Sequence, residues 1–295
     1  MTKSETLSKL AIGIDGATGI SSSSLRSDFA PRNSSVSLET PPVSRALLRL
    51  FTWYSRRYMA RHFNSLRVSG AGLSPEVLTK PLVIYSNHAS WWDPLVGLLL
   101  AREFLPDKTV YAPMDAAALE RYKFFKKLGM FGVEQGTRRG AAEFLRKADA
   151  ILKSSDNALW LTPQSRFADV RERPVQFKSG IGHLPGRAAQ ASYVPVAIEY
   201  TYWEERFPEI LVGFGQAIEV RGDDLNLDPR HWTEFFAAQL ADTQDALTEH
   251  ALCRDPQMFR CIVRGKSGVG GIYDSWRSIR ARWRGEKFKP QHGHI

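Results

Sequence analysis

The chain has 295 residues, of which 43% are hydrophobic, enough for one principal α/β core with extensions or at most two small domains. Forty Lys and Arg against 31 Asp and Glu give a net charge of +9, which favours an anionic partner such as nucleic acid, lipid headgroups or a phosphorylated cofactor. The two cysteines, Cys253 and Cys261, suggest neither a disulfide framework nor a zinc site. We expect no membrane-spanning helix, because no apolar run reaches about 18 residues. We expect no export signal, because the N-terminus lacks a charged segment followed by an apolar segment and a cleavage site.

Residues 1–43 are rich in Ser, Thr and Gly and predict a disordered arm. A helix is expected from Ser44 to about Phe63, followed by a linker to residue 80. Five arginines and no acidic residue accompany its apolar side chains, which include Leu47, Phe51, Tyr54 and Tyr58. Basic amphipathic helices of this kind lie on anionic membrane surfaces, so we assign 44–80 to a membrane interface. Packing of the apolar face onto the rest of the protein is the alternative.

Short β-rich segments then alternate with helical spacing over residues 81–263. The predicted strands are Leu82–Ser86, Thr109–Ala112, Phe131–Glu134, Ala158–Thr162, Tyr193–Tyr200 and Ile210–Phe214. The predicted helices are residues 94–104, 115–128, 138–153 and 179–190. This alternation predicts an α/β fold with a mostly parallel sheet flanked by helices. In such sheets, reactive groups lie in the loops beyond the carboxyl ends of the strands.

A histidine and a carboxylate follow the first of these strands. His88 lies in the loop after Leu82–Ser86, and Asp93 comes five residues later, just before Pro94. We expect Asp93 to cap the helix, with Pro94 as its first residue, so that His88 Nδ1–H folds back onto Asp93. A carboxylate partner fixes the tautomer of an imidazole and stabilises its protonated form. The second ring nitrogen could then take a proton from a hydroxyl.

The order Asn87-His88-(four residues)-Asp93 resembles the first motif of the glycerolipid acyltransferases, and most closely that of the lysophosphatidic acid acyltransferases. Residues 129–134 resemble the second block, although Gln135 stands where that family has Arg. Residues 159–166 resemble the third block, usually Pro-Glu-Gly-Thr-Arg, but are one residue shorter, with Gln for Glu and Ser for Gly. Residues 177–180 and 193–196 match the downstream pattern, so the resemblance covers roughly residues 80–215.

This resemblance implies transfer of a fatty acyl group from acyl-coenzyme A or acyl-carrier protein to a hydroxyl, with His88 as general base and Asp93 as its partner. No metal and no bound cofactor is expected, because the thioester is a second substrate. Backbone N–H groups at the start of helix 94–104 could stabilise the oxyanion. We expect substrate-binding residues at motif positions and at basic positions near the third block. They are Asn87, Glu134, Gln164, Ser165, Arg166, Arg171, Arg173 and Lys178.

The acceptor remains open, because Gln164 replaces a carboxylate in the block that is thought to hold it. Arginine side chains suit phosphate oxygens, which favours a lysophospholipid. The altered third block instead favours an unphosphorylated lipid such as a glycolipid, an ornithine lipid or a pigment. Two further alternatives are that the basic loop is merely solvated and that the protein is a non-catalytic lipid-binding protein of the same fold.

The last segment, residues 264–295, has eight basic and two acidic residues, with Trp276, Ile279 and Trp283 on one helical face. We predict a basic amphipathic tail. Nucleic acid and membrane compete as partners for such surfaces. We favour the membrane, because no nucleic-acid motif is present and an acyltransferase must reach a lipid. The expected location is intracellular, peripheral on the cytoplasmic face of a membrane, and the oligomeric state is left open.

Overall fold

The computed structural model describes residues 40–266, and the predicted arm and most of the tail lie outside them. The described chain builds one sheet with the order β4-β3-β5-β2-β6-β7-β1-β9, and β8 pairs with β6. The strands are β1 Ser65–Ser69, β2 Leu82–Ser86, β3 Thr109–Asp115, β4 Met130–Val133, β5 Asn157–Leu161, β6 Ser192–Thr201, β7 Glu209–Phe214, β8 Ile218–Glu219 and β9 Phe259–Arg264. Five pairings are parallel and three are antiparallel, so the predicted mostly parallel α/β fold is confirmed.

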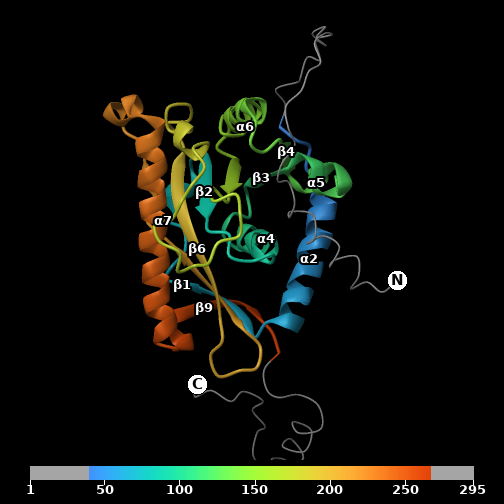
Figure 1. Ribbon diagram of the computed structural model, residues 1–295. Helices are drawn as coiled ribbons and strands as arrows, with labels where there is room; N and C mark the ends of the chain where they lie inside the picture. Colours follow the sequence, from blue (N-terminus) through green and yellow to red (C-terminus); the bar gives the residue numbers. More distant parts are fainter. Residues whose placement is uncertain (1–39, 267–295) are drawn as a thin grey trace, which may run out of the picture. The chain divides into compact units, whose positions relative to one another are not determined.

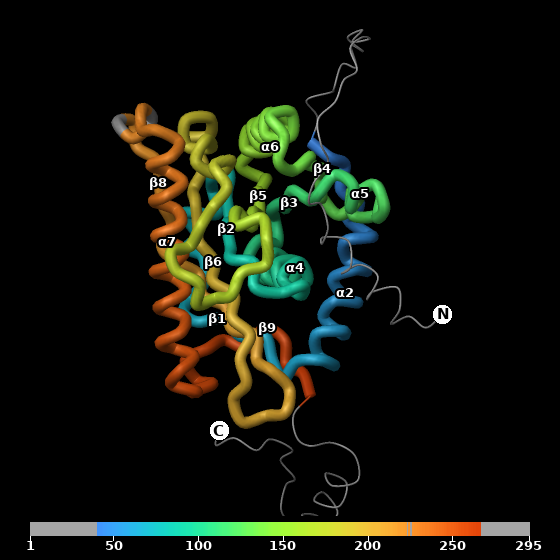
Figure 2. The backbone as a smooth tube through the Cα atoms, viewed as in Figure 1, coloured from blue at the N-terminus to red at the C-terminus, as the bar shows by residue number. Residues whose placement is uncertain are grey.

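Helices cover both faces of this sheet (Figure 1). The helices are α2 Arg45–His62, α3 Pro75–Leu78, α4 Asp93–Phe104, α5 Ala116–Arg121, α6 Arg138–Ile151 and α7 Pro229–Leu252, with short 3-10 turns η1 Lys123–Leu128, η2 Ile181–His183, η3 Gly222–Asn226 and η4 Pro256–Met258. Helices α6 and α7 pack on one face, whereas α4 and α2 lie on the other. The tube view shows α7 and α2 on opposite sides of the strands (Figure 2).

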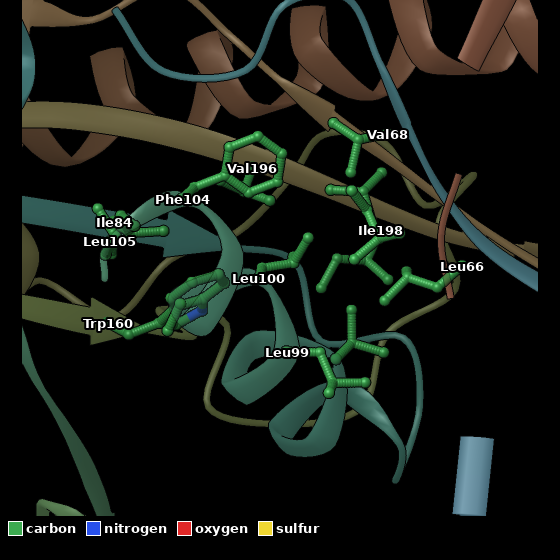
Figure 3. Close-up of a cluster of buried hydrophobic side chains, with 14 of the residues drawn as sticks. Leu66, Val68, Ile84, Leu99, Leu100, Phe104, Leu105, Trp160, Val196 and Ile198 are labelled. Carbon is green, nitrogen blue, oxygen red and sulfur yellow. The ribbon is translucent and has the colours of Figure 1, made fainter. Parts of the chain in front are cut away.

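Alternation along the strands divides the apolar side chains between the two faces. In β2, Leu82 and Ile84 face α4, while Val83 and Tyr85 face α6 and α7. Figure 3 shows the first of these cores, in which Leu99 and Leu100 of α4 lie among strand side chains such as Ile84, Val196 and Ile198. Central strands buried on both faces read as continuous apolar runs, which is why β2 was predictable to its last residue.

Two of the predicted helices differ from the structure. Residues 115–128 form α5 and η1, which are separated at Tyr122. Residues 179–190 form only the short turn η2, because Pro185 and Gly186 follow at once and disfavour a helix. The helix over 179–190 was therefore wrong, and apolar spacing had outweighed the helix breakers.

Elements outside the predicted set complete the sheet and cover it. Strand β1 lies in the expected linker and pairs with β7 and β9, so the sheet begins before residue 81. Helix α7 packs along β6 and β7 through Phe236, Leu240 and Leu247. The sequence signals the start of α7, because Asp228 is followed by Pro229 at the first helical position. The Asp228 side chain caps the helix by accepting a hydrogen bond from the N–H of Arg230.

Candidate active site

The carboxyl ends of β2 and β5 meet in the middle of the sheet, beside β6. Strand β2 ends at Ser86. The side-chain amide of the next residue, Asn87, takes the place of a main-chain pairing with β6. Its Nδ2 donates to the carbonyl of Ile198 at 2.9 Å, and its Oδ1 accepts from the N–H of Ile198 at 2.8 Å. Asn87 is buried and both ends of its amide are engaged, so it positions the loop that carries His88, while its predicted contact with substrate stays a prediction.

His88 and Asp93 contact one another as predicted. His88 Nδ1 lies 2.8 Å from Asp93 Oδ2, and the side chains are 22% and 3% exposed. A carboxylate only accepts hydrogen bonds, so the contact favours the tautomer with the proton on Nδ1. Within residues 40–266, Nε2 of His88 makes no hydrogen bond. It is therefore the nitrogen that can accept a proton from a bound hydroxyl.

Two further donors hold the Asp93 carboxylate. The Ser90 N–H donates to Oδ2 at 3.0 Å, and the Tyr200 hydroxyl donates to Oδ1 at 2.7 Å. Burial, and then the adjacent charge of Asp93, raise the pKa of Tyr200 well above its usual range, so Tyr200 remains a donor at neutral pH. The sequence gives no sign of this role, since Tyr200 is only the last residue of a predicted strand. The register of β6 beside β2 brings it to Asp93.

The loop after β5, residues 162–178, packs against His88 and is named the β5 loop below. Gln164 Oε1 accepts from the His88 N–H at 2.8 Å, and the N–H of Ala168 donates to the His88 carbonyl at 2.9 Å. The Phe167 ring lies 4.4 Å from the imidazole, centroid to centroid. The β5 loop therefore fixes the backbone of His88 and covers part of its ring.

Gln164 has a structural contact that the sequence did not predict. Its side chain is buried and its Oε1 holds the backbone of His88 in place. Its Nε2 has no hydrogen-bonding partner in the part of the chain that the structure describes, so the expected contact with the acceptor stays a prediction that this N–H group could meet. Glutamate at this position would present a second acceptor oxygen instead.

The start of α4 differs from the prediction in two ways. Trp92 is the N-cap, and Asp93 is the first helical residue, so the Asp93 carboxylate does not cap the helix. The amides expected to hold an oxyanion are occupied as well: Leu95 and Val96 donate to the Trp92 carbonyl, and Asp93 donates to Ser90. Pro94 has no N–H. Both predictions were wrong because the turn before α4 closes on itself.

The three arginines predicted to bind phosphate all contact carboxylates. Arg166 pairs with Glu172, and Arg173 pairs with Asp245 of α7. Arg171 lies 2.7 Å from Asp169, although its side chain is 85% exposed. Hydrogen bonding to Arg171 lowers the pKa of Asp169, which keeps this carboxylate charged. Exposed ion pairs contribute little to stability and exchange partners readily, so an anionic ligand could replace these carboxylates.

Three predicted residues remain, and all are exposed. In the described chain, neither Lys178 nor Glu134 makes a side-chain hydrogen bond or ion pair with His88. Ser165 is exposed and adopts a left-handed conformation, with φ of 53°. Its N–H donates to the Thr162 carbonyl at 3.0 Å, closing a tight turn. Glycine adopts this conformation without strain, which accounts physically for glycine in the motif that this turn resembles.

Residues 65–199 match a family model described as Acyltransferase. The chain carries an acyltransferase-family domain. The match begins at β1 and ends within β6, so it includes His88, Asp93 and the whole β5 loop. A search of curated proteins found no match. This match supports acyl transfer as the general activity of the domain.

No helix among residues 40–266 is long and apolar enough to span a bilayer. Within the same residues, no group of three or more His, Cys, Asp and Glu side chains could hold a metal ion.

Proposed function

We propose that this acyltransferase moves a fatty acyl group from acyl-coenzyme A or acyl-carrier protein to a hydroxyl of a lysophospholipid at the cytoplasmic surface of a membrane. The observation that carries the proposal is the 2.8 Å contact between His88 Nδ1 and Asp93, which leaves Nε2 available to a substrate. A base of this kind contributes about 10²–10⁴-fold to rate.

The reaction follows from the two ring nitrogens. Nε2 of His88 takes the proton of the acceptor hydroxyl while its oxygen attacks the thioester carbonyl carbon. Asp93 stabilises the imidazolium that forms, and the donors Ser90 and Tyr200 keep the carboxylate in place. The carbon–sulfur bond then breaks, and the leaving sulfur receives the proton from His88. No covalent acyl-enzyme is required, because the acceptor oxygen attacks directly.

A second acceptor class is an unphosphorylated lipid, such as a glycolipid, an ornithine lipid or a pigment. Two observations favour it: Arg166, Arg171 and Arg173 already contact carboxylates, and Gln164 presents an unpaired amide donor in the described chain. An amide donor suits a hydroxyl or carbonyl oxygen and does not need a charged headgroup.

The experiment that separates these acceptors is incubation of the purified chain with a labelled acyl thioester and a total lipid extract. Label in a phosphatidate or another phospholipid would support the first acceptor class. Label in a neutral or amino-acid lipid would support the second. Release of free fatty acid alone, with no labelled lipid, would contradict transfer to a lipid.

A further inference from the structure

Helix α2 turns one face toward the domain and leaves the other uncovered. Met59 and Ser55 are buried, and Met59 belongs to the core shared with α4. On the opposite side, Leu50 is 61% exposed, Trp53 60% and Tyr54 38%. Their spacing of three and four residues places them together on a helix. Packing onto the sheet therefore explains only the inner face of α2.

The charges around these side chains all have one sign. Arg49, Arg56, Arg57 and Arg61 are exposed on α2, and the helix has no acidic residue. None of them forms an ion pair within residues 40–266. We call this surface, comprising Leu50, Trp53, Tyr54 and the four arginines, the outer face of α2. An exposed apolar group rimmed by unpaired cations complements an anionic bilayer.

The turn η1 extends the apolar part of the outer face. Phe124 is 40% exposed, and its ring lies 5.9 Å from Phe51 of α2. Lys123 and Lys127, also exposed, flank it. Aromatic side chains between cations are typical of protein surfaces at the lipid headgroup level.

A row of ring contacts joins the outer face to the candidate active site. Tyr54 lies 5.9 Å from Tyr58, and Tyr58 lies 5.4 Å from Trp92, centroid to centroid. Trp92 directly precedes Asp93 and caps α4. The loop that holds His88 is thus packed against the helix whose other face is uncovered.

We infer that the outer face of α2 binds an anionic phospholipid bilayer and presents the His88 loop to lipids of that bilayer. A bilayer is favoured over an acidic carrier protein as the partner. A carrier protein would bind the arginines through salt bridges and would not need the apolar side chains of Leu50 and Trp53, which are more than half exposed. This inference deepens the proposed function and rests on it for the identity of the substrate. Binding to the bilayer does not itself require acyl transfer.

The test uses the full chain and vesicles of phosphatidylcholine with or without phosphatidylglycerol, free of acyl donor. Leu50→Ala combined with Trp53→Ala should weaken binding to the anionic vesicles about tenfold or more, because two apolar side chains lose their burial in lipid. Arg57→Gln should weaken it about two- to tenfold, with a loss that shrinks as salt rises.

Two variants on α7 serve as matched controls, since that helix covers the opposite face of the sheet. Leu252→Ala removes a side chain that is 76% exposed, and Arg230→Gln removes a cation that is 87% exposed. Both should bind vesicles like the wild type. Equal binding by the α2 variants and the wild type would overturn the inference, as would a wild type that binds no anionic vesicles at low salt.

Acyl transfer is measured separately with a vesicle-embedded acceptor and with a short-chain, water-soluble acceptor. The α2 variants should lose activity only on the vesicles. If vesicle binding depends on α2 but the protein transfers no acyl group, the proposed function is refuted and bilayer binding by the outer face of α2 is still supported. Binding of an acidic carrier protein through α2, with no binding of vesicles, would overturn the bilayer in favour of a protein partner.

Discussion

The two functional regions of the molecule differ in how their polar groups are partnered. Around His88, the Asp93 carboxylate accepts three hydrogen bonds, and Gln164 holds the His88 backbone. On the outer face of α2, no arginine has a carboxylate partner within residues 40–266. In the first region the contacts within residues 40–266 fix the positions of the side chains, whereas in the second the proposed bilayer supplies the partners of the arginines. Variants of the two regions should therefore fail in different assays.

The largest effect is expected at Asp93. Asp93→Asn should lower kcat about 10²–10⁴-fold with soluble and with vesicle-bound acceptors, because an amide cannot stabilise the imidazolium and can favour the wrong tautomer. It should also cost about 1–3 kcal/mol of stability, since one of the three donors to this buried carboxylate loses its acceptor. Steady-state kinetics and thermal unfolding check both. Unchanged kcat beside lower stability would make Asp93 a structural residue only.

A smaller effect is expected at Tyr200, which acts through Asp93. Tyr200→Phe should lower kcat about tenfold and leave the KM of both substrates nearly unchanged, because a hydrogen bond to a charged group contributes about 1.5–3 kcal/mol. Since burial and Asp93 raise the pKa of Tyr200, the wild type keeps this bond through pH 10, and the variant's deficit should be constant from pH 7 to 10.

A purely structural Tyr200 would instead lower the melting temperature without changing kcat. The control is Tyr202→Phe, which removes the hydroxyl of a tyrosine that is 63% exposed in the same segment. It should match the wild type in both measurements.

The β5 loop offers the next comparison, since its arginines are paired with carboxylates and those of α2 have no such partner among the described residues. Replacing Arg166, Arg171 and Arg173 singly with Gln should raise the KM of a phosphorylated acceptor about two- to tenfold and leave kcat nearly constant, because only uniform binding is lost. Measuring donor and acceptor constants separately distinguishes the acceptor from coenzyme A. If neither constant changes, the ion pairs with Glu172, Asp169 and Asp245 are the whole role of these arginines.

The smallest effect is expected at the turn of the β5 loop. Ser165→Gly should stabilise the protein by about 0–1 kcal/mol, because glycine removes the strain at φ of 53° but adds freedom to the unfolded chain. Ser165→Val should destabilise it by about 1–2 kcal/mol, since a β-branched residue tolerates this conformation poorly. Thermal unfolding measures both. A valine variant as stable as the glycine variant would contradict the left-handed conformation of residue 165 in this turn.

Much of the sheet and of the His88 contact was predictable from sequence, since both depend on local order. Strand β2 is buried throughout, is apolar up to Ser86, and is followed at once by the motif that brings Asp93 back to His88. Strands β1 and β9 were missed because β1 falls in the segment expected to be a linker, and its partners β7 and β9 lie far along the chain. The helix over 179–190 was wrong because apolar spacing was given more weight than Pro185 and Gly186.

The partners of the site residues were not predictable, because they depend on strand register and on loop packing. Tyr200 reaches Asp93 only because β6 runs beside β2, and Asn87 bonds to Ile198 for the same reason. The carboxylates opposite Arg166 and Arg171 lie within the same loop, yet Asp245 comes from α7. Residue type indicated the chemistry, whereas the fold decided which groups were already occupied.

The most direct test of the account is the rate of acyl transfer by His88→Ala against the wild type, with a labelled thioester and the acceptor found in the lipid extract. We expect the variant to fold, since the His88 side chain is 22% exposed and lies in a loop. Circular dichroism and vesicle binding check this. We predict a rate lower by about 10²–10⁴-fold with vesicle binding unchanged. A folded variant that transfers the acyl group as fast as the wild type would contradict His88 as the general base.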